Sequence, residues 1–113
     1  MINLEQDKAK LIQLLMALES LGSATAIAEF FEKEGIKGAR LLACSCPVAN
    51  YLKNNGLRCG VVPYTHVVLL DAPDWITDRG ASVSLTNGEL RNVNSFAARF
   101  DNNDFPKLVR RYS

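Results

Sequence analysis

The sequence predicts an α+β fold in a single domain over residues 1–113, with an N-terminal three-helix segment, an antiparallel sheet of three or four strands, and C-terminal helices packed on it. Apolar side chains follow helical spacing in the first half of the chain, change to alternating or continuous runs from Arg58, and return to helical spacing after Asn94. Because the helices and hairpins form separate runs and do not alternate as βαβ units, the sheet should be antiparallel. A chain of 113 residues fits one domain.

Two helices begin the chain. Leucines at helical spacing predict a helix over 4–21, which Gly22 can end in a left-handed cap. A second helix over 24–34 has Ser23 as its cap and Gly35 as its stop. Since only two residues join them, these helices should form an antiparallel or crossing pair.

A connector and a third helix follow. We expect the connector, residues 37–45, to tuck its apolar side chains inward; these are Leu41, Leu42 and Ala43. The third helix should start at Cys46 or Pro47, because proline is favoured at the first helical position, and should end at 54–56.

The second half of the chain predicts two hairpins and a helical end. Strands over 59–63 and 66–70 should turn at Pro63-Tyr64-Thr65. Strands over 82–86 and 89–93 flank Asn87-Gly88, the strongest short hairpin signal in the chain. A fourth helix should cover 94–101. A last turn after Asp104 should place three side chains on the core, namely Phe105, Leu108 and Val109.

Composition excludes several classes of protein. The net charge of +1 gives no strong field to attract nucleic acid or a membrane. Residues 37–70 nevertheless carry four cations and no acid, whereas residues 1–36 carry six acids and three lysines. This pattern allows a mildly electropositive face suited to a small anion or a phosphate. Three cysteines without a signal peptide or a membrane span indicate a reduced, cytoplasmic protein.

Residues 44–66 hold all three cysteines and the single histidine, so candidate chemistry is concentrated there. Cys46 at a helix start would have its thiolate stabilised, and His66 with Asp71 or Asp78 could act as base and orienting carboxylate. This catalytic set resembles the layout of papain-like and transglutaminase-like enzymes. Those families place the histidine much further along the chain. A buried cysteine also packs as a small apolar group, and that interpretation is favoured.

Two further hypotheses use the same stretch. Four side chains have the right chemistry for zinc, although their spacing matches no common zinc motif; they are Cys44, Cys46, Cys59 and His66. The order of helices and hairpin also fits a winged-helix DNA-binding protein. The third helix has a single cation, Lys53, so nucleic acid is disfavoured. Trp75 in the loop after the first hairpin could instead anchor a partner protein.

Two motifs resemble a known group of proteins. The segments CPVANYL at 46–52 and FAARFDNNDFPKLV at 96–109 are similar to small bacterial proteins of unassigned function. In that group CP[LV]AxYL follows two helices and FDxxx[FY]PxL closes the chain. The resemblance implies the same fold outline and a bacterial or phage-like origin. It brings no activity, cofactor or catalytic residue.

These observations favour a non-enzymatic binding or regulatory accessory protein in the cytoplasm. Its partner would be a protein or a small anionic ligand, with no cofactor and no membrane, and homo-oligomers stay open. The alternatives are a small Cys–His(–Asp) thiol hydrolase or transferase and a winged-helix DNA-binding protein.

Overall fold

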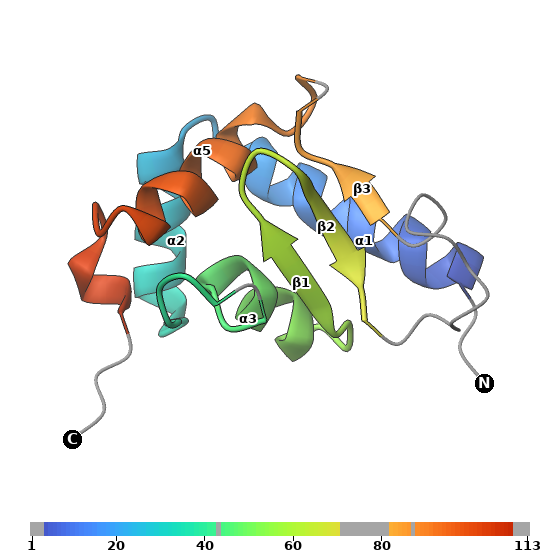
Figure 1. The fold of residues 1–113 in the computed structure, drawn as a ribbon, viewed down its shortest axis with the longest axis horizontal. Coiled ribbons are helices and arrows are strands. Elements are labelled where there is room, and N and C mark those ends of the chain that lie inside the picture. Colours follow the sequence, from blue (N-terminus) through green and yellow to red (C-terminus); the bar gives the residue numbers. More distant parts are fainter. Residues whose placement is uncertain (1–3, 43, 71–81, 87, 110–113) are drawn as a thin grey trace.

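The computed structural model describes residues 4–42, 44–70, 82–86 and 88–109. Its elements, in order, are α1 (Leu4–Glu19), α2 (Ala24–Glu34), α3 (Pro47–Asn54), β1 (Cys59–Val62), β2 (His66–Leu69), β3 (Ser82–Ser84), α5 (Arg91–Asp101) and the 3-10 helix η1 (Pro106–Leu108) (Figure 1). The α+β fold is confirmed, with three helices before an antiparallel sheet and helical segments after it.

Residues at the helix ends behave as their types predict. At the start of α2, Ser23 Oγ accepts the N–H of Ala26 at 3.0 Å, and Gly35 with φ 72° ends the helix. Cys46 is the N-cap of α3 and Pro47 its first residue. The third helix therefore starts where the sequence predicts.

The first two helices meet at a sharp angle. Gly22, with φ 97°, lies in the break between them. In the described part of the chain, no single helix is long and apolar enough to cross a membrane. Residues 6–19 and 24–34 reach that length and composition only as a pair, and the pair is bent by 107°.

The sheet has one buried and one open face. Its order is β1-β2-β3, with both pairs antiparallel. Val61 pairs with Val67, which pairs with Val83, and this row faces the core. The alternate row of Val62, His66 and Ser84 points the other way. In Figure 1, α1 passes behind the sheet, so the second row lies on the face turned to the viewer.

Aromatic side chains join α5 to α2 and to the end of the chain. Phe31 and Phe96 meet edge to face with ring centroids 5.2 Å apart. Phe96 also stacks on Phe105 at 5.2 Å. Leu108 is buried, and Phe105 and Val109 pack against the core, which confirms the prediction for the last turn.

The predicted second hairpin is wrong. Residues 89–93 form a turn and the first residues of α5, while the described strand before them is β3, over 82–84; Asn87 lies outside the described residues. Leu90, Val93 and Ala97 are buried at helical spacing, continuous with the rest of α5. This tertiary packing overrides the local turn signal.

A carboxylate of α1 holds the start of α5. Glu19 Oε1 accepts the N–H of Asn92 at 2.9 Å and that of Val93 at 3.0 Å. Leu90, at the N-cap position, makes no side-chain cap bond. Glu19 therefore supplies the missing cap from another helix, and its charge lies at the positive end of the helix dipole.

The connector runs along the surface, so the prediction that its apolar side chains are tucked inward is wrong. Leu41 is 72% exposed and Leu42 is 55% exposed, so neither is tucked inward; Ala43 lies outside the described residues. The connector lies on the surface because hydrogen bonds attach it to the end of α5. Arg40 donates from Nε and Nη2 to the Asp101 carbonyl at 3.1 and 2.9 Å, and the Leu41 N–H donates to Asp101 Oδ1 at 3.0 Å.

We expect Glu19→Ala to lower the free energy of unfolding by about 1–2 kcal/mol, because two backbone N–H groups at the start of α5 lose a charged acceptor. Urea unfolding followed by circular dichroism measures this. Glu29→Ala, on an exposed position of α2, is the control and should change the value by less than about 0.5 kcal/mol. Equal stability of the two variants would contradict the cap.

Candidate functional site

Cys46 is sealed in the core. Its side chain belongs to the hydrophobic cluster and is 4% exposed. Sγ accepts the N–H of Ala49 at 3.4 Å, which is the N-cap bond of α3. Burial nevertheless dominates and raises the pKa of the thiol from 9.0 to about 12. At neutral pH the group is a protonated, small apolar side chain that also caps a helix.

The connector also passes very close to the backbone of Cys46. A Cβ on Gly38 would lie 2.4 Å from the Ser45 carbonyl oxygen and 2.7 Å from the Cys46 carbonyl carbon. The chain before the helix therefore packs directly on the residues that carry the thiol, and Gly38 is required for this approach. A side chain at position 38 would force the connector away from Cys46.

His66 lies on the opposite side of the sheet from the core. It is half-buried on the open face, between Val62 and Ser84 of the neighbouring strands. The structure describes both His66 and Cys46 and gives no hydrogen bond between them. Asp71 and Asp78 lie outside the described residues, as does Trp75. The catalytic set therefore stays a prediction. The Cys46 thiol is buried, whereas the His66 imidazole is half-buried on the open face of the sheet.

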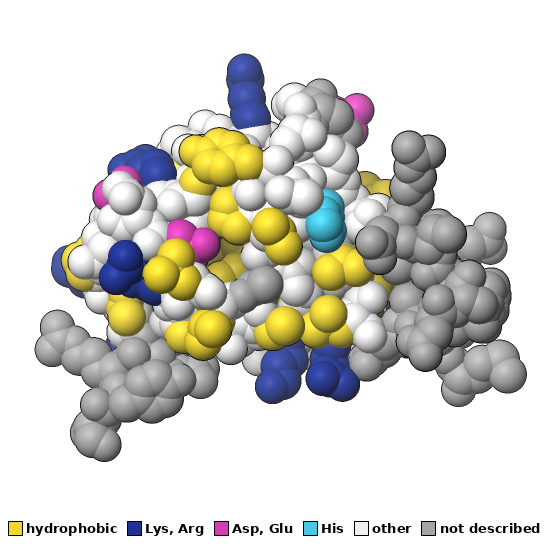
Figure 2. Space-filling model, in the orientation of Figure 1, with side chains coloured by type: hydrophobic (Ala, Val, Ile, Leu, Met, Phe, Trp, Pro, Cys, Tyr) yellow, Lys and Arg dark blue, Asp and Glu magenta, His cyan; other side chains and the backbone are white. Residues whose placement is uncertain are grey.

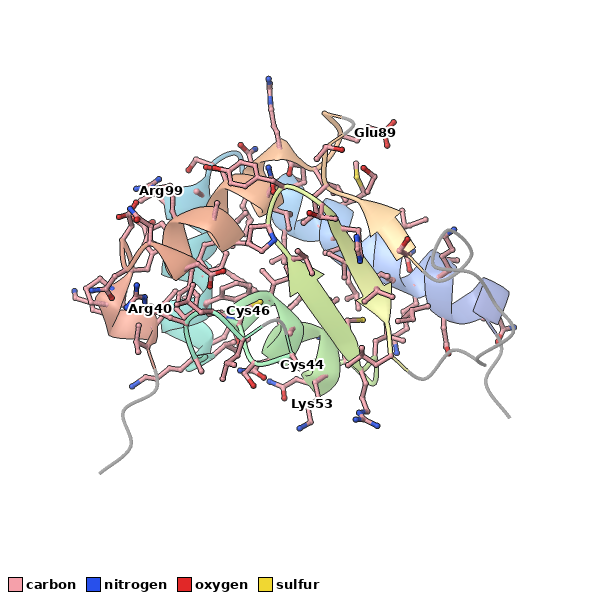
Figure 3. All side chains as sticks on the ribbon, in the orientation of Figure 1. Arg40, Cys44, Cys46, Lys53, Glu89 and Arg99 are labelled. Atoms are coloured by element: carbon pink, nitrogen blue, oxygen red, sulfur yellow. The ribbon has the colours of Figure 1, made fainter. Side chains whose placement is uncertain are left out.

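The four candidate zinc ligands do not form a metal-binding cluster. Cys59 is buried on β1, Cys44 is exposed in the connector, and all three cysteines are free thiols. Figure 3 shows Cys44 and Cys46 near the start of α3. Among the described residues, which include all four candidates, no group of three His, Cys, Asp or Glu side chains is arranged to hold a metal ion.

The third helix offers little to a DNA groove. Four of its eight residues are buried, namely Pro47, Val48, Ala49 and Leu52. Asn50 Nδ2 donates to the carbonyls of Lys37 and Ser45, so this amide is engaged within the protein. Lys53 is the cation of this helix. Recognition helices instead present several polar or basic side chains to the bases and phosphates.

A polar depression of about 190 Å³ lies between the ends of α2 and α3. Lys37 and Lys53 line it, together with Asn50 and Asn54. These cations fit the predicted preference for a small anion. However, α2 and α3 both end here, and helix C-termini carry partial negative charge. The lysines are therefore well placed to offset those helix ends, which weakens the depression as an anion site.

The tip of the first hairpin shows an unusual backbone. The N–H of Thr65 donates to the Val62 carbonyl at 3.1 Å, which closes the turn predicted here. Pro63 takes the second position, and Tyr64 has φ 63° at the third. A positive φ at the third position is typical of a type II turn, where glycine or asparagine normally stands. Tyr64 is also 69% exposed.

Leu41 in the connector repeats this combination. Its φ is also 63°, and it is the most exposed large hydrophobic residue in the described part of the chain. The third residue there with a positive φ that is not glycine is Asn103, a type that tolerates this conformation. For leucine and tyrosine, the left-handed region costs about 1–2 kcal/mol.

One face of α5 fixes both residues. The Tyr64 N–H donates to Asn94 Oδ1 at 2.5 Å, and the Leu41 N–H donates to Asp101 Oδ1 at 3.0 Å. Asn94, Ala98 and Asp101 are spaced by four and three residues, so they share one side of the helix. The two bonds are therefore about 10 Å apart along α5.

A hollow of about 380 Å³ opens over this side of α5. It is lined by Pro63, Tyr64, Ala98, Arg99, Asp101 and Asn102. Figure 3 shows Arg99 and Arg40 at the same end of the molecule. The hollow is therefore lined both by Tyr64, whose backbone is strained, and by Asp101, whose carboxylate holds Leu41.

The exposed hydrophobic residues extend this site across the open side of the molecule. Five of them belong to the connector and the β1–β2 hairpin, and we name this set the apolar face: Leu41, Leu42, Val62, Tyr64 and Leu70. Figure 2 shows hydrophobic side chains gathered over this region, with lysines and arginines at its margin and acidic atoms exposed between the hydrophobic side chains. Exposed apolar patches of this kind commonly mark binding sites.

The sequence places Tyr64 in a turn and Leu41 in the connector, but it predicts neither the exposure of Leu41 nor a binding role for Tyr64. The exposure of Tyr64 could have been predicted, since an aromatic residue at the tip of a three-residue turn cannot reach the core. Leu41 carried no such signal, because its exposure depends on bonds to Asp101, sixty residues later.

Comparisons with known proteins give no relative: no family model, no curated protein and no solved structure matches this chain. The predicted resemblance to small bacterial proteins therefore stays a prediction.

We expect iodoacetamide at pH 8 to modify Cys44 and to leave Cys46 and Cys59 unmodified in the folded protein. Cys44 is exposed and the other two are buried. A thiol with a pKa of about 12 is also ionised in only about one molecule in ten thousand at pH 8. Mass spectrometry should count one adduct in buffer and three in urea. Fast modification of Cys46 in the folded protein would contradict its burial.

Proposed function

We propose that this chain is a non-enzymatic binding protein that docks a partner protein through the apolar face. One observation carries the proposal: Leu41 and Tyr64, the two most exposed large hydrophobic residues that the structure describes, share a left-handed backbone that neither residue type favours. Side chains of α5 hold both of them there.

The left-handed backbone at Leu41 and Tyr64 costs free energy, and their exposed side chains gain little burial within the chain. Each positive φ costs about 1–2 kcal/mol, and the exposed side chains recover little of it by burial. Strained backbone of this kind is found where a site needs a side chain in a fixed position. Anchors that are already ordered lose less entropy on binding than flexible ones. Tyrosine is also among the residues that contribute most at protein interfaces.

The same surface argues for binding over catalysis. The thiol of Cys46 is buried and its pKa is raised to about 12, whereas a nucleophilic cysteine needs a lowered pKa and access to substrate. The hollow beside Tyr64 is open and its lining includes no cysteine or histidine. These features support an accessory protein in preference to a thiol hydrolase.

The cellular setting is part of the proposal. Three free thiols, of which Cys44 is exposed, are suited to a reducing compartment and support a cytoplasmic location. A bacterial or phage origin is part of the same proposal and rests on the predicted resemblance of the segments at 46–52 and 96–109 to small bacterial proteins.

Tyr64→Ser should abolish partner binding while the protein stays folded, because position 64 is exposed and the change removes an anchor. The test immobilises wild type and variant, exposes them to extract of the source cells, and measures retained proteins by mass spectrometry. We expect at least one protein to be retained at least tenfold less by Tyr64→Ser, and direct titration of that purified protein should repeat the difference.

Ile12→Ser is the matched control, since Ile12 is 42% exposed on α1 and lies outside the apolar face. It should retain the partner as wild type does. Identical profiles for wild type and Tyr64→Ser would contradict the proposal, as would a partner lost with Ile12→Ser and kept with Tyr64→Ser. Circular dichroism and the thermal midpoint check that each variant is folded.

A further inference from the structure

The charges around the apolar face indicate the chemistry of its partner. Residues 37–70, which supply the whole apolar face, contain Lys37, Arg40, Lys53 and Arg58 and no acidic residue. Figure 3 places Arg40 and Lys53 at two different edges of this side of the molecule. A partner that matches an apolar centre and a basic margin is itself apolar and acidic.

Two arginines near the hollow are already held in place. Arg40 uses Nε and Nη2 to bind the Asp101 carbonyl. Arg99 uses Nε to bind Asp104 Oδ2 at 3.2 Å, and its guanidinium lies 4.9 Å from the centre of the Phe105 ring. Among the described residues, these contacts leave Nη1 of Arg40 and both terminal nitrogens of Arg99 without a hydrogen-bond partner.

Fixed guanidinium groups with spare N–H donors suit carboxylates. A carboxylate accepts two parallel N–H bonds from one guanidinium, and less entropy is lost when the arginine is already ordered. The nearby acids are engaged within the protein, since Asp101 Oδ1 accepts the Leu41 N–H and Asp104 Oδ2 accepts from Arg99. These two carboxylate oxygens are therefore already used within the protein, although Asp101 also lines the hollow.

We infer that the apolar face binds an acidic peptide segment, whose apolar side chain enters the hollow beside Tyr64 while its carboxylates pair with Arg99 and Arg40. This inference rests on the proposed function and adds the chemical nature of the partner. Nucleic acid is a poorer match, because Tyr64 is the single aromatic residue of the apolar face and the centre is aliphatic. Single strands bind along several stacking rings and a continuous basic groove.

The test uses a library of random twelve-residue peptides displayed on phage. The library is depleted on immobilised Tyr64→Ser and then selected on wild type. We expect the enriched peptides to contain more Asp and Glu than Lys and Arg, together with aliphatic or aromatic residues. The best peptide, synthesised with a fluorescent label, should bind wild type more weakly as salt increases.

Substitutions then locate the carboxylate contact. Arg99→Gln should weaken binding of the labelled peptide at least tenfold and reduce the salt dependence of binding. The affinity of Arg99→Lys should lie between those of wild type and Arg99→Gln, because lysine keeps the charge and loses the planar guanidinium. Lys33→Gln, which removes a cation from an exposed position of α2, should change affinity less than twofold. Thermal midpoints check folding, and equal affinities of wild type and Arg99→Gln would overturn the inference.

Other results separate this inference from the proposed function. Enriched peptides that are neutral or basic would overturn the acidic partner, as would a library with no peptide that prefers wild type. The proposed function would still stand if retention of a protein from the cell extract depends on Tyr64. A labelled twenty-nucleotide DNA strand that binds at 0.15 M salt and is lost with Tyr64→Ser would favour nucleic acid instead. A dimer in sedimentation that Tyr64→Ser dissociates would assign the face to a second copy of this chain.

Discussion

Two side chains on one face of α5 organise the functional surface of this protein. Asn94 and Asp101 accept the backbone N–H groups of Tyr64 and Leu41, which belong to a turn and a connector far away in sequence. An N–H that is bonded to a buried or half-buried side chain fixes the backbone of its residue. Each loop therefore keeps a left-handed conformation that its own sequence does not favour, and each presents an apolar side chain to solvent.

This arrangement requires α5 to be rigidly placed, and the rest of the fold provides that. Glu19 of α1 caps its first turn, while Phe96 packs between Phe31 of α2 and Phe105 at the end of the chain. Tightly packed interiors of this kind resist small displacements. The core thus determines the position of the helix, and the helix determines the position of the apolar face.

The sequence predicts much of the fold and little of the site. Helical spacing with Ser23 and Gly35 predicts α2 well, and Pro47 predicts the start of α3, because these signals are local. The strand predicted over 89–93 is wrong, since its turn signal competes with the cap from Glu19 and with burial along α5. The N-cap position of Cys46 follows from Pro47, but its burial depends on packing in the core cluster that no local pattern reveals. Likewise, the outward direction of Leu41 depends on bonds to Asp101 that no local pattern reveals.

Leu41 and Tyr64 are held in a strained backbone that lowers the stability of the protein. Unfolding free energies of glycine and alanine variants at these two positions test it most directly. Both substitutions remove the exposed side chain, and only glycine also removes the penalty of a positive φ. We expect Leu41→Gly and Tyr64→Gly each to be more stable than the matching alanine variant by roughly 1 kcal/mol. Alanine variants that are as stable as the glycine variants at both positions would contradict it.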